Sequence, residues 1–444
     1  MRLDRIDASP AGSGCVHGWG HMMRYRLYLI SIVVLHTSAS WAQTPGPLTW
    51  EQVRQRFEQK NPTLAADQLS VDESKAQEIT AYLRPNPDFS LTVDAIQIAP
   101  NKGVWQPFVG TFETPGISYL HERQHKREMR LESAQKATMV AQSSHADLDR
   151  TLLFDLRSAF VSTLQAKAVL QLAKDNLAYY DHLLDVSRAR FNAGDIAQID
   201  LDRLELQRVQ YESDWQTAEV NLRTAKIQLL TLLNDRTPIE QFDVTGTYDF
   251  SDQLPPREQF RTFALDTRPD LRAAIEAIDK AQSDHKLAIA NGSTDPIFGG
   301  WYTHNSSNNN PFGLNTVGGS VSIPLRIFDR NQGEKLRTEL DIARTQKLRE
   351  ASEAQVFSDV DSAYAALDSS LMLLRPYKRR YLQQAVRVRD TVAFAYQQGG
   401  ASLLDFLNAQ GEYRAVELSY VNLIGSYLTA AAQLNLAVGR EVIP

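Results

Sequence analysis

The sequence predicts a mainly α-helical protein that also contributes β-strands to a membrane β-barrel. Three observations lead to this prediction. The chain repeats itself once, each copy contains very long stretches of helix-forming residues, and each copy contains short segments in which polar and apolar residues alternate. The 47 Lys and Arg residues are balanced by 53 Asp and Glu residues and are spread along the chain, which argues against the basic face of a nucleic-acid-binding protein.

The repeat is recognised from matching segments at a nearly constant separation. Asn61-Pro62-Thr63-Leu64 resembles Arg268-Pro269-Asp270-Leu271, 207 residues later. FNAGDIAQID over 191–200 resembles YQQGGASLLD over 396–405, 205 residues later. We therefore predict a tandem duplication. Its parts are a first repeat over 43–236, a connector over 237–256 and a second repeat over 257–444.

Two long helices are predicted in each repeat, over about 124–192 and 196–234 and over about 330–398 and 402–438. Residues 124–191 include neither Pro nor Gly, and at 1.5 Å per residue this helix would be roughly 100 Å long. Its counterpart contains Pro376, which should kink or break it. The last helix of each repeat carries apolar residues at alternating steps of three and four, which predicts coiled-coil packing. The positions are Phe406, Ala409, Tyr413, Val416, Tyr420, Leu423, Tyr427, Ala430, Leu434 and Ala437, and their equivalents from Leu201 to Leu232, with one break at Arg208.

Strands are predicted over about 88–122 and 296–324. Phe89, Leu91 and Val93 alternate with polar residues, as do the apolar residues after position 316, which is typical of a strand with one apolar face. Four strands cannot close into a barrel, and an open sheet edge is not tolerated in hydrocarbon, so several chains must combine their strands. Aromatic residues cluster in these segments as they do in interface girdles: Trp105, Phe108, Phe112, Tyr119, Phe298, Trp301 and Tyr302.

The N-terminus has the features of a secretory signal peptide. Arg24 and Arg26 precede the apolar run Leu27–Leu35, and small residues follow as far as Ala42. We expect cleavage before Gln43, which makes residues 1–42 an N-terminal extension and signal peptide. The only cysteine, Cys15, lies in this segment, so the mature chain is expected to have no disulfide.

The order of elements, the duplication and the two glycine-centred turns resemble the outer-membrane efflux protein (TolC-like) family. Ile323–Glu334, which contains Arg330-Asn331-Gln332-Gly333, and Arg84–Phe89 are similar to the branch that serves cobalt–zinc–cadmium and copper–silver efflux pumps. The resemblance implies a homotrimer in the outer membrane with a large periplasmic part, a twelve-stranded β-barrel, a twelve-helix α-barrel and the connector in an equatorial region. It also implies a periplasmic adaptor (membrane fusion protein) and an inner-membrane pump of the resistance-nodulation-division type as partners.

The resemblance further implies roles for residues at the helix tips. Asp200 and Tyr396 correspond to a hydrogen-bonded pair that holds the periplasmic gate shut, and Asp405 corresponds to an acidic ring. The sequence departs from the family at Ala401, where the gate arginine would be, and at Asn408, where a second aspartate would be. Gly194 and Gly399 should adopt the left-handed conformation that ends a helix, and Asp195 and Ser402 should cap the next helices. The turn residues expected to contact the adaptor are Phe191, Gly194, Asp195, Gly399 and Ser402.

One motif suggests an enzyme. His121-Glu122-Arg123-Gln124-His125 has the spacing of a zinc-protease helix, but it straddles the predicted end of a strand and start of a helix, and no third ligand follows. We therefore predict no enzymatic activity, no metal site and no cofactor. The function expected is a passive exit duct, with heavy-metal cations as the preferred cargo. A type I secretion or drug-efflux duct and a soluble periplasmic coiled-coil scaffold are the alternatives.

Overall fold

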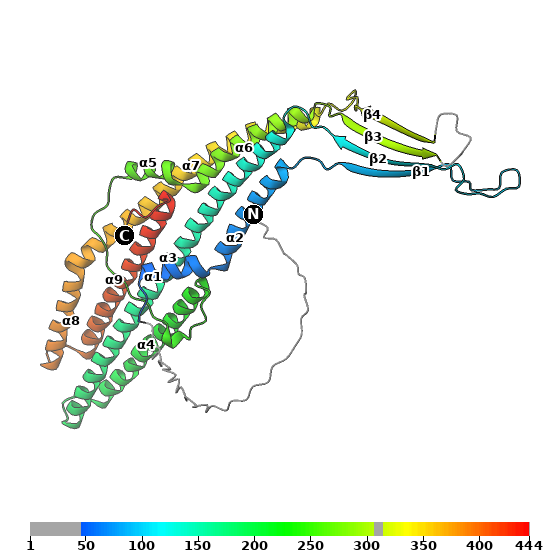
Figure 1. Cartoon of the computed structure of the whole chain (residues 1–444). Coiled ribbons are helices and arrows are strands. Elements are labelled where there is room, and N and C mark those ends of the chain that lie inside the picture. Colours follow the sequence, from blue (N-terminus) through cyan, green and yellow to red (C-terminus); the bar gives the residue numbers. More distant parts are fainter. Residues whose placement is uncertain (1–45, 306–313, 444) are drawn as a thin grey trace, which may run out of the picture. The chain divides into compact units, whose positions relative to one another are not determined.

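The computed structural model describes residues 46–305 and 314–443, and the signal peptide and cleavage site predicted above lie outside them. Residues 45–444 form one compact unit. Its architecture is mainly helical with one small sheet, as the sequence predicted (Figure 1).

The first repeat begins with two short helices and ends with two long ones. A capping box formed by Thr49 and Gln52 starts the first helix, and Asn61 ends it, because the following Pro62 has no N–H to continue the ladder. Asn61 also caps the second helix by accepting a hydrogen bond from the Leu64 amide. The elements are α1 (Trp50–Lys60), α2 (Pro62–Tyr82), β1 (Asp88–Asp94), β2 (Phe112–Leu120), α3 (Lys126–Asn192) and α4 (Gln198–Leu232).

The second repeat follows the same order, with Arg268-Pro269 at the break between its first two helices. Within the connector, Val244 pairs with Leu48 in an isolated β-bridge, which ties the start of the described chain to the junction of the repeats. The elements are a 3₁₀ turn (Ile239–Gln241), α5 (Arg257–Thr267), α6 (Pro269–Asn291), β3 (Ile297–Asn305), β4 (Asn315–Ser322), α7 (Gln332–Pro376), a π-helical turn (Tyr377–Tyr381), α8 (Leu382–Gln397) and α9 (Leu403–Val438).

Pro376 perturbs the second long helix as the sequence predicted. The helix stays continuous, but its five residues after Pro376 wind as a π-helix before α8 resumes. Proline removes one N–H donor and crowds the preceding turn, so the local hydrogen bonds shift to the wider spacing. The first repeat has no proline here, and α3 runs through 67 residues without interruption.

The long helices pack in the lateral order α4, α3, α9 and then α7 with α8, so that α4 and α8 form the two edges (Figure 1). The predicted seam of α9 lies in this bundle, with Phe406, Tyr427 and Leu434 fully buried. Helix α9 alone among the described helices is long and apolar enough to cross a membrane, but 56% of its most apolar stretch is buried, as in a core helix. The seam break at Arg208 is an ion pair with Asp181 on α3, at 2.5 Å.

The sheet is an antiparallel meander in the order β1-β2-β3-β4, which leaves β1 and β4 as edges. Its register sorts the side chains onto two faces. Phe89 pairs with Ile117, which pairs with Gly300, so these residues share an apolar face. The opposite, polar face carries mainly Ser, Thr and Gly. The apolar face is exposed in the single chain, where Phe89 retains 75% and Val317 84% of its surface.

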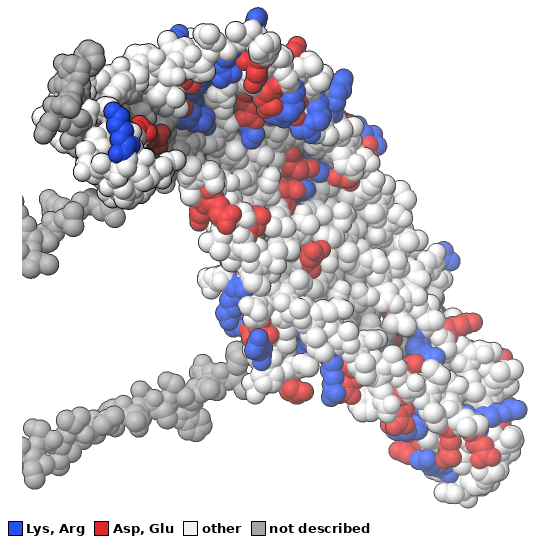
Figure 2. All heavy atoms as spheres, turned by 90° about the vertical axis from the view of Figure 1, so that its right-hand side faces the viewer, with Lys and Arg blue, Asp and Glu red and all other residues white. Residues whose placement is uncertain are grey.

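Charged residues of both signs are interspersed over the helices on the face that Figure 2 displays. No single-sign patch covers the described part of that face. This distribution agrees with the balanced composition and gives no footprint for a nucleic-acid backbone.

Candidate functional site

The helix tips are built around two tight glycine turns. Gly194 after α3 has φ +83° and Gly399 after α8 has φ +76°, the left-handed conformation that the sequence predicted. In each turn an amide reaches back over the last helical turn, from Asp195 to the Arg190 carbonyl at 2.9 Å and from Gly400 to the Ala395 carbonyl at 2.8 Å. A Cβ at Gly194 or Gly399 would meet no other atom within 4 Å, so these glycines serve the backbone conformation, not close packing.

The helices that leave the two turns start differently. Ser402 caps α9 in a full capping box, since its hydroxyl accepts from the Asp405 amide at 3.1 Å and its own amide donates to the Asp405 carboxylate at 3.2 Å. The corresponding prediction that Asp195 caps the next helix is wrong. The residue at the N-cap of α4 is Ala197, which has no side chain to cap with, and Asp195 lies two residues earlier in the exposed turn.

Asp405, the predicted acidic-ring residue, is exposed at the tip. Hydrogen bonds from the Ser402 side chain and then from its backbone hold the pKa of Asp405 below its ordinary value. The carboxylate is therefore charged at neutral pH, although two of its contacts are used in capping.

Tyr396 lies in the core that joins the tips of the two repeats. Its ring stacks on Phe406, with centroids 5.0 Å apart and planes 21° apart, and the Arg190 guanidinium lies 5.6 Å from its centroid. Burial raises the pKa of Tyr396, the charge of Arg190 lowers it and the charge of Asp200 raises it. The same core contains Tyr180, Leu183, Leu184, Leu201, Leu204, Tyr211 and Leu403, and Phe191, Ala401 and Leu407 pack on it.

The structure brings Asp200 near Tyr396 but does not join them. Within the described residues of one chain, the Tyr396 hydroxyl and the Asp200 carboxylate share no hydrogen bond. Phe191 and Ala401 are half-buried against the tip core, whereas Asn408 is exposed on α9. Sequence reasoning missed Arg190, whose only signal is its place one turn before Gly194.

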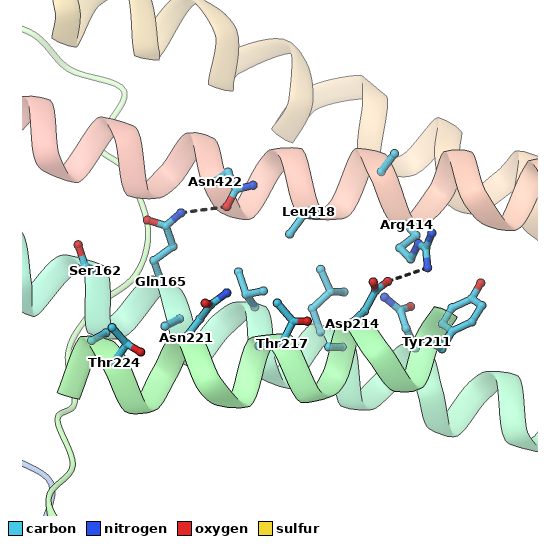
Figure 3. A pocket seen from close by; sticks show the side chains of 18 of the residues that line it. Ser162, Gln165, Tyr211, Asp214, Thr217, Asn221, Thr224, Arg414, Leu418 and Asn422 are labelled. Atoms are coloured by element: carbon cyan, nitrogen blue, oxygen red, sulfur yellow. Dashed lines mark hydrogen bonds and ion pairs between the residues drawn. The ribbon is translucent and has the colours of Figure 1, made fainter. Parts of the chain in front are cut away.

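Above the tips, a groove of about 720 Å³ runs between α4 and α9 over a floor formed by α3 (Figure 3). One polar contact joins its two sides, and another joins its floor to α9. Asp214 of α4 pairs with Arg414 of α9 at 2.8 Å, and Gln165 of α3 donates to Asn422 of α9 at 2.9 Å. The Arg414 guanidinium also lies 4.9 Å from the Tyr211 ring centroid. Polar side chains thus connect the two repeats at the groove, where apolar side chains do not fill the space between them.

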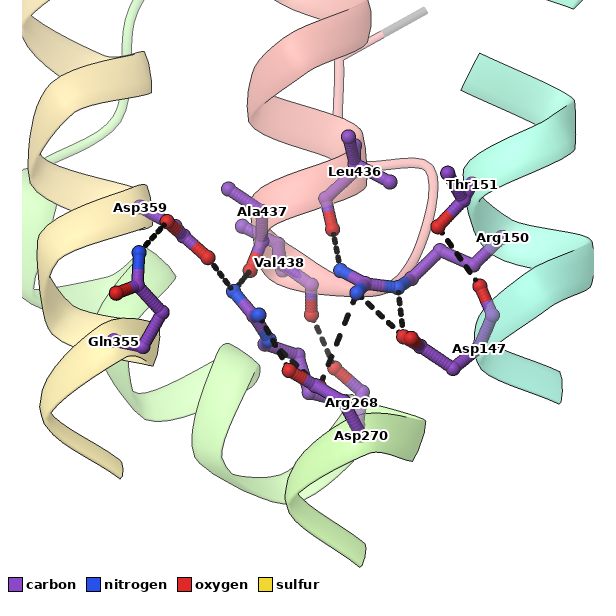
Figure 4. Close-up of polar contacts among 11 residues, drawn as sticks. Asp147, Arg150, Thr151, Arg268, Asp270, Gln355, Asp359, Leu436, Ala437 and Val438 are labelled. Atoms are coloured by element: carbon purple, nitrogen blue, oxygen red, sulfur yellow. Dashed lines mark hydrogen bonds and ion pairs between the residues drawn. The ribbon is translucent and has the colours of Figure 1, made fainter. Parts of the chain in front are cut away.

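At the upper end of α9, two arginines hold the final carbonyl groups of the helix (Figure 4). Arg268, whose side chain is 3% exposed, donates to Asp270, to Asp359 at 2.8 Å and to the Ala437 carbonyl at 3.2 Å. Arg150 of α3 donates to Asp147 and to the Leu436 carbonyl. Arginines at this position satisfy carbonyls that an α-helix leaves free, and they match its negative end. Four helices, α3, α6, α7 and α9, therefore meet in one charged cluster.

The H-E-x-x-H segment is a junction between strand and helix, as predicted. Strand β2 ends at Leu120 and α3 begins at Lys126, with Gln124 and His125 both at positive φ, so the two histidines do not share a helical face. The Glu122 carboxylate is held by the Arg130 guanidinium. Among the described residues, no group of three His, Cys, Asp or Glu side chains is arranged to hold a metal ion.

Comparison with known proteins gives one family and several relatives of similar fold. Residues 262–440 match the model of a family described as outer membrane efflux protein. The chain is 22% identical over 408 residues to the cobalt-zinc-cadmium resistance protein CzcC of Cupriavidus metallidurans, covering 90% of this chain and 91% of that one. It is 22% identical over 319 residues to the outer membrane protein TolC of Escherichia coli, covering 69% and 64%. The solved structure of CusC superposes with a TM-score of 0.75 at 17% identity, covering 92% of this chain and 96% of that chain.

Proposed function

Because the chain belongs to the outer membrane efflux protein family, we propose that three copies form the outer-membrane exit duct of a tripartite pump that expels heavy-metal cations. The exit duct and its outer-membrane location follow from the family. The trimer, the cargo and the gate are proposals, and each is supported by a different part of the chain.

The need for more than one copy follows from the two unpaired sheet edges, and three is the number that the family resemblance implies. Strands β1 and β4 expose free backbone groups next to an apolar face, and neither is stable in a bilayer unless another strand covers it. Four strands are too few to close, and three chains supply twelve, which is within the range of membrane barrels. Three copies of the long helices would continue this barrel as a twelve-helix tunnel.

The helices at the two edges of the bundle expose apolar residues that a neighbouring copy would have to cover. Helix α4 exposes apolar residues along one side, at steps of 7, 3, 11 and 7, with Leu206 73% and Val220 59% exposed. Helix α8 and the end of α7 at the opposite edge expose Phe394, Val388 and Met372. Apolar stripes on the two edges of one protomer would cover each other in a closed ring of copies. The α4 stripe is Ile199, Leu206, Val209, Val220 and Ile227.

The cargo proposal rests on charge as well as on the relative's name. The four described strands contain no Lys or Arg, and their register places Asp88 and Asp94 on the polar face. A lumen lined by these strands would repel anions and attract cations. The relative CzcC carries cobalt, zinc and cadmium in its name, and its length is matched nearly throughout. A deletion strain should therefore lose tolerance to one of these metals before it loses tolerance to drugs or fails to secrete protein.

The gate proposal rests on the tip core. The periplasmic mouth would be closed by tip helices held together through Tyr396, Phe406 and Arg190, with Asp200 and Asp405 lining the opening. Engagement of the turns by the hairpin of an adaptor would bias the tips toward a second, open packing. A stacked aromatic pair contributes about 0.5–1.5 kcal/mol beyond its buried area, so three copies make a stable but reversible closure.

Two experiments test these proposals. Membrane fractionation should place the protein in the outer membrane, with a heat-resistant trimer on denaturing gels, and a soluble monomer would rule out the duct. In planar bilayers, Tyr396→Ala should raise single-channel conductance because it removes the stack on Phe406. Tyr396→Phe keeps the stack and should conduct like the wild type. A Tyr396→Phe channel as open as Tyr396→Ala would show that the hydroxyl, and not the stack, closes the mouth.

A further inference from the structure

The polar face of the sheet carries one large aromatic side chain in its middle. The register places Ser90, Gly116, Trp301 and Gly318 in one row across the four strands, on the face opposite Phe89 and Val317. Trp301 therefore has a glycine on each neighbouring strand. The next row toward the outer end consists of four threonines: Thr92, Thr114, Thr303 and Thr316.

The indole of Trp301 lies across one of these two glycines. A Cβ on Gly318 would lie 2.5, 2.6 and 2.8 Å from indole atoms Cε2, Cζ2 and Nε1. The atoms nearest to a Cβ on Gly116 include no indole atom and only the Cβ of Trp301, at 3.5 Å. The side chain thus leans toward β4 and rests on bare backbone, an arrangement in which an aromatic ring shields a strand glycine. Trp301 is still 39% exposed, so its other side faces the space in front of the polar face.

We propose that Trp301 lines the exit passage of the barrel and selects for cations there. The inference rests on the proposed trimer, in which the apolar face contacts lipid and the polar face therefore lines the lumen. In that barrel three indoles would narrow the passage next to a band of threonine hydroxyls.

The chemistry of this surface favours positive charge. The face of an indole is electron-rich and attracts cations, and Asp88 and Asp94 at the two ends of β1 are on the same face of the sheet. No basic side chain of the four described strands opposes them. A cation leaving the duct would pass the carboxylates and the indoles, and an anion would be disfavoured by both.

The experiment measures how fast charged reagents pass Trp301 from outside. Cys15 is replaced by serine, and single cysteines are introduced as Ser118→Cys, one row inside Trp301, and Thr92→Cys, one row outside it. Intact cells are treated with methanethiosulfonates that carry either a trimethylammonium or a sulfonate group. Val321→Cys on the apolar face is the control for orientation.

We expect Trp301→Ala to lower the ratio of cationic to anionic labelling at Ser118→Cys by about 2- to 5-fold, the range for an exposed cation–π contact. Trp301→Phe should retain part of the preference, and the ratio at Thr92→Cys should change less. Gly318→Ala leaves no room for the resting indole and pushes it into the passage, so both reagents should label Ser118→Cys more slowly.

The outcomes separate this inference from the proposed duct. Ser118→Cys could react with the same ratio of cationic to anionic labelling in the Trp301 and Trp301→Ala proteins. The proposed cation selection would then be wrong, and the proposed barrel would stand. If Ser118→Cys is protected while Val321→Cys reacts with the charged reagents, the polar face does not line a lumen and the proposed barrel is wrong.

Discussion

Replacing Arg268 with alanine should loosen the upper end of α9. Arg268 makes two hydrogen bonds to Asp270, at 2.9 and 2.6 Å, one to Asp359 and one to the Ala437 carbonyl. Removing one partner of a fully buried pair costs about 3–5 kcal/mol. Asp270 and Asp359 keep 26% and 33% of their side chains exposed, so we expect the lower end of this range. A decrease of about 1.4 kcal/mol in the free energy of local opening raises the exchange rate tenfold. Amide exchange in the last turn of α9, where it proceeds by local opening, should therefore accelerate roughly 100-fold or more.

The matched control is Arg223→Ala. Arg223 also pairs with an acidic residue, Glu219 at 3.2 Å, but its side chain is 61% exposed. Exposed ion pairs contribute little to stability, so this variant should leave amide exchange in α9 unchanged. Hydrogen–deuterium exchange followed by mass spectrometry measures both variants on the same peptides.

Acidification gives a second check on the same reasoning. Burial alone would raise the pKa of Asp270, but the hydrogen bonds and charge of Arg268, with the charge of Arg150, lower it below the ordinary value. A lowered carboxyl pKa stabilises the fold above the unfolded value near 4 and stops doing so as the pH falls through the folded value. The difference between wild type and Arg268→Ala should therefore be complete at pH 7 and shrink below about pH 4. Equal exchange in Arg268→Ala and Arg223→Ala, or a difference independent of pH, would refute the reasoning.

Two further predictions concern the tips and the edges. Gly194→Ala meets open space but must keep φ near +83°, so it should destabilise the fold by about 1–2 kcal/mol in denaturant unfolding, and Gly194→Asn by less. An unchanged denaturant midpoint in both variants would show that the turn adopts another backbone conformation without cost. Leu206→Asp should abolish the heat-resistant trimer while preserving the helical circular dichroism spectrum, because a carboxylate would be buried between copies. A stable trimer of this variant would show that the α4 stripe is not an interface.

Local sequence signals predicted the fold class and much of the tips. The absence of proline before Phe191 allows the full length of α3, and Pro376 marks the position where the second long helix changes its winding. Gly194 and Gly399 identified the turns because no other residue adopts positive φ at so little cost. These features depend on residues near in sequence, so they can be read without the fold.

Features that depend on distant residues could not be predicted in the same way. The capping prediction for Asp195 failed because the turn is two residues longer than the pattern assumed, which leaves Ala197 at the N-cap. Arg268 was visible in the segment that repeats Asn61–Leu64, but two of its partners, Asp359 and the Ala437 carbonyl, lie 91 and 169 residues away. The contact of Trp301 with Gly318 requires the strand register, which alternating residues do not fix by themselves.

The two repeats end their last helices with different chemistry at equivalent positions. The Leu232 carbonyl of α4 accepts from the neutral amide of Asn61 at 3.0 Å, whereas the Ala437 carbonyl of α9 accepts from Arg268. A fall in pH through the lowered pKa of Asp270 would protonate this carboxylate beside Arg268 and leave the Asn61 contact untouched. In the proposed trimer, the three α9 ends would then be sensitive to acid and the three α4 ends would not, so alternate helix pairs around the ring would respond to acidity.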